Sequence, residues 1–211
     1  SLASKAFFNT KDLRSVTFAE GSKLTFIGTY CFRYSGIESI VIPSGVTLLG
    51  TSKTSASVGS SAYQFADCPN LRTVEFRGNL TKLGGYVFYG CTALETVTLP
   101  KTTTQIGNYC FKGCTSLKTI QLLSTADLTI GSYSFEGAGL TSVTIPGSTI
   151  AINAYAFRNC ADLAEVTYAA GAKNLTIGNG VFTGSGLVQA EIPARAAKLG
   201  NSVYENCTSL K

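Results

Sequence analysis

Apolar and polar residues recur along the chain in one fixed order. The most regular mark is a central aromatic residue, the anchor, which stands at Phe7, Phe32, Phe65, Phe88, Phe111, Phe135, Phe157, Phe182 and Tyr204. Successive anchors are 22 to 25 residues apart, except for the 33 residues between Phe32 and Phe65. Self-similarity at a fixed period of this size indicates a repeat architecture.

Each unit contains two extended pieces. Six residues after the anchor comes Leu or Ile and then a V-x-[FLIY] pattern, as in Leu94, Val97 and Leu99. This alternation in a segment rich in Val, Ile and Thr predicts a short strand, which Pro43, Pro100, Pro146 and Pro193 end in their units.

The second piece, such as TTQIG at 103–107, ends four residues before the anchor in an aliphatic residue and a glycine. We expect a turn with positive φ at this glycine, because Asn153, the exception, is the next residue best able to adopt positive φ.

A single unit of this length cannot bury its own Leu, Ile, Val and Phe. Units stacked in register can bury them against one another, so the pattern predicts a solenoid. We expect one solenoid domain over residues 1–211. The ten extra residues of the long unit form an inserted loop at 50–61, whose Ser, Thr and Gly content is typical of a flexible surface segment.

The pattern F-x-x-C-x-x-L-x-x-V-x-L-P, followed by I-G-x-x-[AC]-F, resembles the BspA-type (Treponema-type) leucine-rich repeats of bacterial and protozoan surface proteins. The resemblance runs from Phe7 to Lys211. It implies a leucine-rich-repeat solenoid, a right-handed stack of about eight coils with a parallel sheet of short strands on one face and little regular helix. The long unit and three shorter units with an extra glycine, at Gly36, Gly139 and Gly186, depart from the pattern.

The seven cysteines fall at two repeat positions. Cys68, Cys91, Cys114, Cys160 and Cys207 stand three residues after an anchor, and Cys31 and Cys110 stand just before one. Other units carry small or apolar residues there, so we expect buried, free thiols that act in packing. Equivalent cysteines of stacked coils have parallel Cβ directions, which disfavours disulfides. With no histidine in the chain, we predict no metal site and no cofactor.

Charge and composition favour an extracellular setting. Charged residues make up 14% of the chain, against roughly 25% in an average soluble domain, and Ser, Thr, Asn and Gly supply the polarity. The net charge of +5 is spread without clusters, so nucleic acid is not an expected partner. No apolar run approaches the ~20 residues of a transmembrane helix. The chain enters and leaves in mid-repeat without polar caps, so we expect a segment of a longer protein.

The first exposed strand positions alternate in charge, which predicts a ladder that fixes the register: Arg14, Glu38, Arg72, Glu95 and Lys118. The outward positions that follow are mostly hydroxyl-bearing, and we assign them as the candidate partner-binding surface: Ser15, Thr17, Thr73, Glu75, Thr96, Thr98, Thr119, Gln121, Ser142, Thr144 and Thr167. Threonine is also a good strand former that needs no function, so both interpretations stay open. Tyr34 and Tyr89 join the candidates, because they lie between anchor and strand where other units carry Asn, Asp or Gly.

Catalysis is not expected, since the chain has no histidine and neither a recurring carboxylate pair nor a nucleophile elbow. The prediction is a non-enzymatic cell-surface or extracellular protein that binds a protein partner or a glycan. The family resemblance implies adhesion to host matrix, host surface proteins or other cells. Two alternatives are an accessory surface lipoprotein that captures peptide or glycan for an outer-membrane uptake complex, and a structural spacer.

Overall fold

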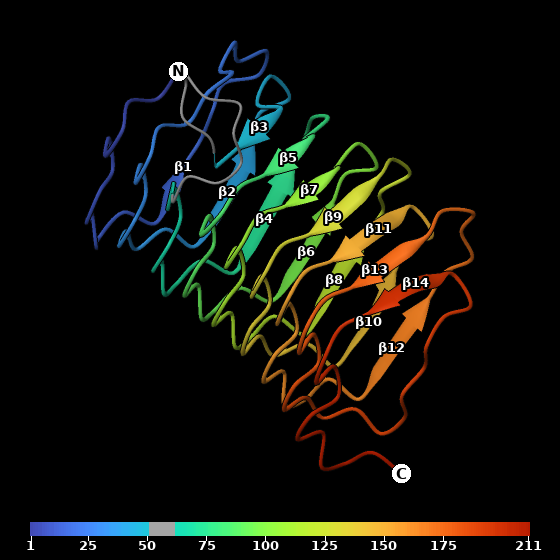
Figure 1. Cartoon of the computed structure of the whole chain (residues 1–211). Helices are drawn as coiled ribbons and strands as arrows, with labels where there is room; N and C mark the ends of the chain where they lie inside the picture. The colour runs from blue at the N-terminus through green and yellow to red at the C-terminus, as the bar shows by residue number, and fades with distance from the viewer. Residues whose placement is uncertain (51–61) are drawn as a thin grey trace.

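The computed structural model describes residues 1–50 and 62–211, in which the chain winds as a solenoid from one end of the molecule to the other (Figure 1). No helix forms within these residues. The strands in chain order are β1 (Ser15–Val16), β2 (Ser39–Ile42), β3 (Leu48–Leu49), β4 (Thr73–Phe76), β5 (Lys82–Leu83), β6 (Thr96–Leu99), β7 (Gln105–Ile106), β8 (Thr119–Leu122), β9 (Leu128–Ile130), β10 (Ser142–Ile145), β11 (Thr149–Ile152), β12 (Glu165–Tyr168), β13 (Leu175–Ile177) and β14 (Ala196–Leu199). The inserted segment predicted at 50–61 lies outside the described residues, apart from Gly50.

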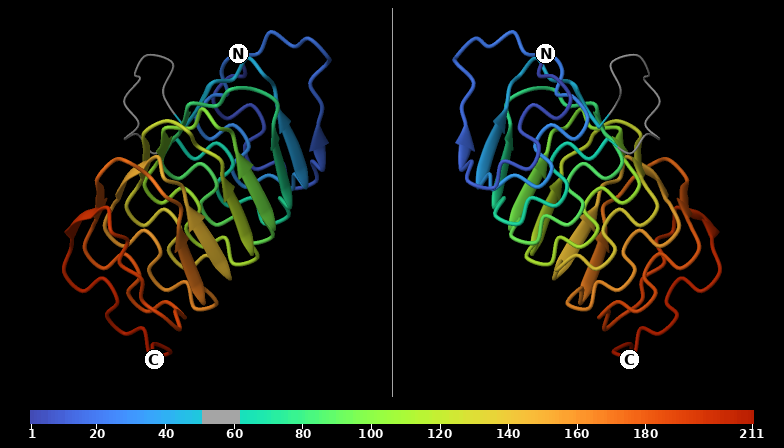
Figure 2. Two further views of the ribbon diagram at one scale, coloured as in Figure 1. Left: turned by 90° about the vertical axis from the view of Figure 1, so that its right-hand side faces the viewer. Right: turned by 90° about the vertical axis from the view of Figure 1, so that its left-hand side faces the viewer.

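The predicted solenoid is confirmed, and it carries parallel strands on two faces (Figure 2). On one face β1, β2, β4, β6 and β8 form a five-stranded sheet in that order, and β10 pairs with β12 beyond it. On the other face β14, β13, β11, β9, β7, β5 and β3 form a seven-stranded sheet. The short extended pieces ahead of the anchors therefore pair into a second sheet, in addition to the single sheet expected from the sequence.

Backbone hydrogen bonds join successive coils at the anchors as well as in the sheets. The N–H of Phe88 donates to the carbonyl of Cys110 at 2.9 Å, and the N–H of Phe111 donates to that of Ser134 at 2.7 Å. Each coil thereby supplies hydrogen-bond partners for the buried backbone groups of its neighbour, so the corners need no helix to satisfy them.

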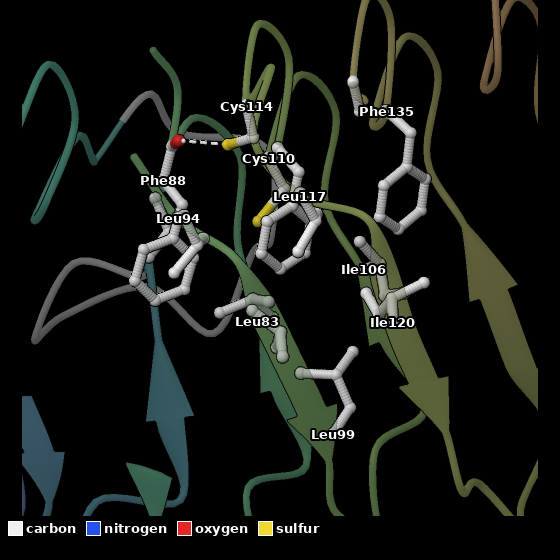
Figure 3. Packing of buried hydrophobic residues seen from close by; sticks show 14 of the residues in the cluster. Leu83, Phe88, Leu94, Leu99, Ile106, Cys110, Cys114, Leu117, Ile120 and Phe135 are labelled. Carbon is white, nitrogen blue, oxygen red and sulfur yellow. Dashed lines mark hydrogen bonds between the residues drawn. The ribbon is translucent and has the colours of Figure 1, made fainter. Parts of the chain in front are cut away.

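The core is a continuous apolar stack between the two sheets (Figure 3). Seven anchor phenylalanines are fully buried: Phe32, Phe65, Phe88, Phe111, Phe135, Phe157 and Phe182. Their rings lie parallel to the next along the stack, with centroids 5.0 to 5.6 Å apart. Leu, Ile and Val from both sheets fill the space around them. Burial of each such side chain contributes roughly 1.5–3 kcal/mol, so regular stacking supplies the stability that no single coil has.

The glycine ahead of each anchor is needed for a different reason from the one predicted. The positions Gly28, Gly84, Gly107, Gly131, Gly178 and Gly200 do not adopt positive φ. At Gly107 an added Cβ would lie 2.3 Å from the carbonyl carbon of Gly84 in the preceding coil, where backbone passes against backbone. The expectation of a positive φ was wrong, and the close approach of neighbouring coils explains the residue.

Positive φ occurs instead on either side of the anchor. Two residues before it stand tyrosines with φ between 47° and 60°: Tyr30, Tyr63, Tyr86, Tyr109, Tyr133 and Tyr155. Two residues after it stand mainly Asn, Asp or Gly, as at Asn159 and Gly113. These two left-handed residues turn the chain through the aromatic corner. A bulky residue in this conformation is strained, so the recurring tyrosine implies a compensating interaction.

That interaction is a second aromatic stack. The six tyrosine rings lie one above another with centroids 4.6 to 5.4 Å apart, parallel to the phenylalanine stack but half-exposed at the corner. Aromatic pairs of this kind contribute about 0.5–1.5 kcal/mol each beyond the area they bury, an amount comparable with the backbone strain. These six tyrosines therefore pack the corner of the solenoid.

All seven cysteines are buried free thiols, as the repeat positions predict. The thiols three residues after the anchor share one contact: each donates to the carbonyl of the anchor phenylalanine in the preceding coil. The distance is 2.9 Å for Cys68 and Cys91, 3.1 Å for Cys114, and 3.0 Å for Cys160 and Cys207. Cysteine therefore supplies both a small side chain and a donor that ties coil to coil. Burial raises the pKa of Cys114 and of Cys160 to about 12.

The last predicted strand, at 188–192, does not form. Ala190 stands there in place of the valine or isoleucine that most other strands turn into the core, and it is exposed. Ile192 is 57% exposed. An alanine buries little area and has low strand propensity, which explains the loss of regular pairing.

Candidate functional site

The predicted partner-binding residues of the strands share one surface. We call hydroxyl face the outward side of β1, β2, β4, β6, β8, β10 and β12. Parallel pairing aligns Ser15, Ser39, Thr73, Thr96 and Thr119 across five strands, and it aligns Thr98 with Gln121 and Thr144 with Thr167. Glu75 faces Val41 of β2, Ser142 faces Glu165, and Thr17 follows directly after β1. All the predicted strand residues are exposed.

Some side chains of the hydroxyl face form hydrogen bonds with one another. The Thr98 hydroxyl donates to Gln121 Oε1 at 3.2 Å, and the hydroxyls of Thr144 and Thr167 lie 2.9 Å apart. Hydroxyls toward β1 and β4, such as Ser15 and Thr73, make no such side-chain bond within the described residues. This end of the face is the more available one for a partner.

The predicted charge ladder forms along the entry side of the same strands. Arg14 pairs with Glu38 at 3.5 Å, and Arg72 pairs with Glu95 at 2.9 Å. Lys118 reaches Asp162 at 2.7 Å instead of a neighbour in the ladder. Because all of these side chains are more than half exposed, each pair contributes little stability, and its main effect is to keep the ladder neutral.

Two hollows open on the hydroxyl face, and the sequence pattern did not lead us to predict them. The first has a volume of about 400 Å³ and lies at β1 and β2, where its lining includes Thr17, Phe18, Val41, Pro43 and Arg77. The second has a volume of about 380 Å³ and lies at β4 and β6, where its lining includes Thr73, Phe76, Thr96, Thr98 and Pro100. Volumes of this size lie at the lower end of the range for ligand sites in proteins.

A signal for these hollows is present in the sequence. The last strand position is Phe18 or Phe76 at the hollows, where most other strands end in Ile or Leu. Val41 is an apolar residue in the outward row that otherwise holds Thr, Glu and Gln. Only the pairing of strands places these exceptions side by side.

Tyr34 and Tyr89 do not lie on the hydroxyl face; they lie at the aromatic corner. Tyr34 has φ of 61° and is 40% exposed, with its ring 5.8 Å from Phe8. Tyr89 stands one residue earlier in its unit, since Gly90 is the residue with positive φ there, and its half-buried ring packs 5.7 Å from Tyr86. The equivalence expected between these two tyrosines was wrong.

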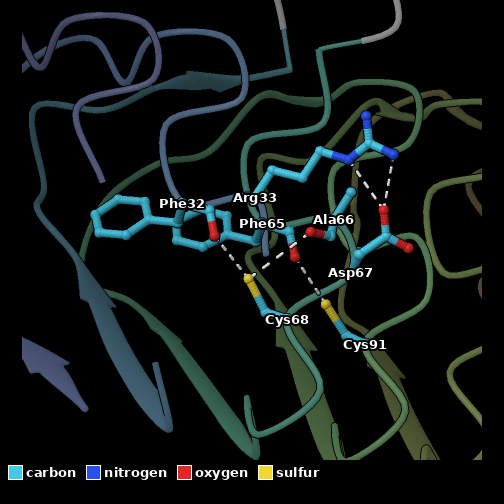
Figure 4. A network of polar contacts seen from close by, with 7 residues as sticks. All are labelled: Phe32, Arg33, Phe65, Ala66, Asp67, Cys68 and Cys91. Carbon is cyan, nitrogen blue, oxygen red and sulfur yellow. Dashed lines mark hydrogen bonds and ion pairs between the residues drawn. The ribbon is translucent and has the colours of Figure 1, made fainter. Parts of the chain in front are cut away.

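Arg33 forms an ion pair with Asp67 at this corner (Figure 4). Its guanidinium lies 4.5 Å from the ring centre of Tyr34 and 4.7 Å from that of Tyr63, and it pairs with Asp67 at 2.9 Å. Further along the stack, Lys112 binds Glu136 at 2.7 Å, and this hydrogen bond raises the pKa of the lysine. Arg33 and Lys112 at this corner are thus already paired within the chain, so the hydroxyl face is the stronger candidate site.

Among residues 1–50 and 62–211, no cluster of three or more Cys, Asp or Glu side chains is arranged to hold a metal ion. The same residues contain no helix long and apolar enough to span a membrane.

Comparison with protein families completes the assignment. The model of the BspA type leucine rich repeat region, with six copies, matches residues 1–57, 52–160 and 128–211. The chain belongs to this family. Comparison with curated proteins finds no match.

Solved structures share the BspA-type solenoid. A leucine rich cell surface protein from Faecalibacterium prausnitzii A2-165 is 26% identical, with a TM-score of 0.61 over 82% of this chain and 46% of that one. A leucine-rich repeat protein from Bacteroides ovatus is 21% identical, with a TM-score of 0.59 over 100% of this chain and 62% of that one. The T. pallidum leucine rich repeat protein TpLRR is 21% identical, with a TM-score of 0.57 over 87% of this chain and 68% of that one.

The BspA-type chain thus spans about half the length of the F. prausnitzii protein and less than two thirds of the B. ovatus protein. At these identities the second and third likenesses establish the fold. The family and the F. prausnitzii likeness together indicate a repeat scaffold of the bacterial surface type with a protein-binding role.

Proposed function

We propose that this chain is the binding part of a non-enzymatic cell-surface or secreted protein, and that its hydroxyl face contacts a protein on a host matrix or on another cell. The family supports a binding scaffold, and the likeness to the F. prausnitzii cell surface protein supports the location. Adhesion to the matrix or to another cell is the specific form of binding that we propose.

One observation carries the choice of surface. The exposed residues Ser15, Ser39, Thr73, Thr96 and Thr119 stand in register across five adjacent strands, so their hydroxyls recur at the ~4.8 Å spacing of a sheet. A regular polar surface of this length, rich in hydroxyls, offers many modest contacts to an extended partner, which is the way in which solenoid faces bind.

The test is capture on immobilised collagen, laminin and fibronectin, measured by biolayer interferometry. The triple variant Thr73→Arg, Thr96→Arg, Thr119→Arg covers the centre of the hydroxyl face with long charged side chains, and we expect it to lose capture. The matched control is Gln105→Arg, Thr129→Arg, Thr176→Arg, which places the same three arginines on exposed or half-exposed positions of the seven-stranded sheet and should bind like the wild type.

Equal capture by the triple variant and the wild type would exclude the hydroxyl face. If the wild type binds none of these matrix proteins but co-purifies with an outer-membrane transporter, the uptake lipoprotein replaces adhesion. If it binds neither, the spacer interpretation replaces it.

A further inference from the structure

The two hollows are built from the same kinds of residue. The first combines Phe18, two residues after β1, with Gly21 in the turn that follows and Pro43 from the next coil. The second combines Phe76 at the end of β4, Gly78 two residues later and Pro100 from the next coil. Both phenylalanine rings are half-buried, so part of each apolar ring faces the hollow. Each hollow thus opens where a phenylalanine at or just after the end of one strand lies beside the proline that follows the neighbouring strand.

A basic side chain from the residue that follows β4, Arg77, lines the first hollow and has hydrogen-bond donors without a partner. Arg77 Nε donates to Glu75 Oε1 at 3.1 Å, and both side chains are 60% exposed. Within the described part of the chain the two terminal nitrogens of Arg77 have no ion-pair or hydrogen-bond partner. A guanidinium fork in this state can bind a carboxylate through two parallel bonds. Glu20 lies in the first hollow and would repel an acid placed deeper there.

The separation of the hollows selects a ligand conformation. The first hollow lies at β1 and β2 and the second at β4 and β6, in the sheet order β1-β2-β4-β6. If each hollow is taken to lie midway between its two strands, the hollows are two strand spacings apart, or about 9.6 Å at ~4.8 Å per strand. Side chains three residues apart on a polyproline II helix lie about 9.3 Å apart on one side, at ~3.1 Å per residue. Side chains on one side of a β-strand recur at ~6.7 Å, which does not fit.

We propose that the two hollows form one peptide-binding groove, which holds a segment of the protein partner in polyproline II conformation across β1, β2, β4 and β6. Apolar side chains three positions apart enter the hollows, and an acidic residue between them binds the free nitrogens of Arg77. Aromatic and proline surfaces such as those of Phe18, Pro43, Phe76 and Pro100 suit this preformed, extended backbone. The inference rests on the proposed protein-binding function and names the chemistry of the partner.

The direct test titrates a blocked synthetic peptide, Pro-Leu-Pro-Glu-Leu-Pro, into the isotopically labelled chain and follows backbone amide shifts by NMR. We expect binding with a dissociation constant on the order of 100 μM, because a short peptide makes few contacts. The shifts should map to residues 17–21, 41–44, 75–78 and 96–99. Replacing Glu by Gln in the peptide should weaken binding roughly tenfold, since a charge-assisted bond is lost. Placing the two leucines two positions apart, the spacing of a β-strand, should weaken binding by a similar factor.

Two variants of the protein have matched controls. Arg77→Gln should weaken binding roughly tenfold, whereas Arg72→Gln, which removes the same charge from the ladder, should change it less than about twofold. Val41→Thr places in the first hollow the residue that β6 carries at the equivalent position, and we expect about threefold weaker binding from the lost apolar contact. Val188→Thr is its control, because Val188 is 41% exposed in the last coil, far along the chain from both hollows.

Equal weakening by Arg77→Gln and Arg72→Gln would indicate general electrostatics and overturn the groove, as would peptides that bind equally whatever their leucine spacing. Binding of a glycan array with no binding of the peptide would overturn it too.

Thr119→Arg separates this inference from the proposed function, because Thr119 lies on the hydroxyl face but lines neither hollow. If matrix capture survives Arg77→Gln and Val41→Thr but is lost in Thr119→Arg, the groove is wrong and the hydroxyl face stands. If the peptide binds the hollows and no matrix protein is captured, adhesion fails and the groove stands.

Discussion

Tyr109 offers the most direct test of the balance between backbone strain and aromatic stacking. Its φ is 58°, and its ring lies between those of Tyr86 at 4.7 Å and Tyr133 at 5.0 Å. We compare Tyr109→Ala with Tyr109→Gly, two substitutions that both remove the ring. At an ordinary position glycine is the worse of the two; at this position we expect the opposite order.

The magnitude follows from the contacts. Both variants lose two stacked pairs, at about 0.5–1.5 kcal/mol each in addition to the buried area. Alanine keeps a left-handed conformation that costs an L-residue about 1–2 kcal/mol, and glycine avoids this cost. The glycine variant in turn loses about 0.4–1 kcal/mol of stability relative to alanine, because its unfolded chain has more conformational freedom. The net expectation is that Tyr109→Gly unfolds with a free energy about 0.5–1 kcal/mol higher than that of Tyr109→Ala.

The assay is urea unfolding followed by circular dichroism, with the midpoint and the m-value compared between variants. Thr129→Ala and Thr129→Gly form the control pair, because Thr129 lies within β9 and has no positive φ. Glycine should be the less stable of that pair by about 0.5–1 kcal/mol. If Tyr109→Gly falls below Tyr109→Ala as it does at Thr129, the left-handed strain is absent and the explanation for the tyrosine stack fails.

Three further predictions concern thiols, glycines and surface charge. Burial raises the pKa of Cys160 from 9.0 to about 12, so its thiol ionises first in the unfolded chain. The contribution of this thiol to the free energy of unfolding is fully present below pH 9 and falls toward pH 12 by up to about 1.4 kcal/mol per pH unit. Urea midpoints of Cys160→Ala should therefore fall less steeply over this pH range than those of the wild type. Gly107→Ala places a Cβ 2.3 Å from Gly84 and should cost about 3 kcal/mol in urea unfolding; a cost below about 1 kcal/mol would contradict the close approach. Arg72→Ala breaks the exposed pair with Glu95 and should cost less than about 0.5 kcal/mol, and a larger loss would show that the ladder sets stability.

The candidate surface shows which features of a binding site could be predicted from the sequence. Thr73, Thr96 and Thr119 could be predicted to lie side by side from the repeat alone, because equal spacing from the anchor becomes equal height in a stack of coils. Tyr89 was misaligned although the sequence shows the offset: it stands one residue after the anchor Phe88, whereas Tyr34 stands two residues after Phe32. The hollows were missed because each needs a phenylalanine from one coil and a proline from the next, and the sequence pattern treats coils as equal.

The repeat, the solenoid, the buried phenylalanine and cysteine positions and the outward-facing residues all follow from the amino-acid sequence. They depend on one period, because stacked copies of a unit can share a core only in register. The folded chain was needed to learn why each coil requires its glycine, which residues adopt positive φ, that the short pieces form a second sheet, and where the face is hollow. These features depend on distances between neighbouring coils, such as the 2.3 Å approach at Gly107, and a one-dimensional pattern contains no distances across the stack.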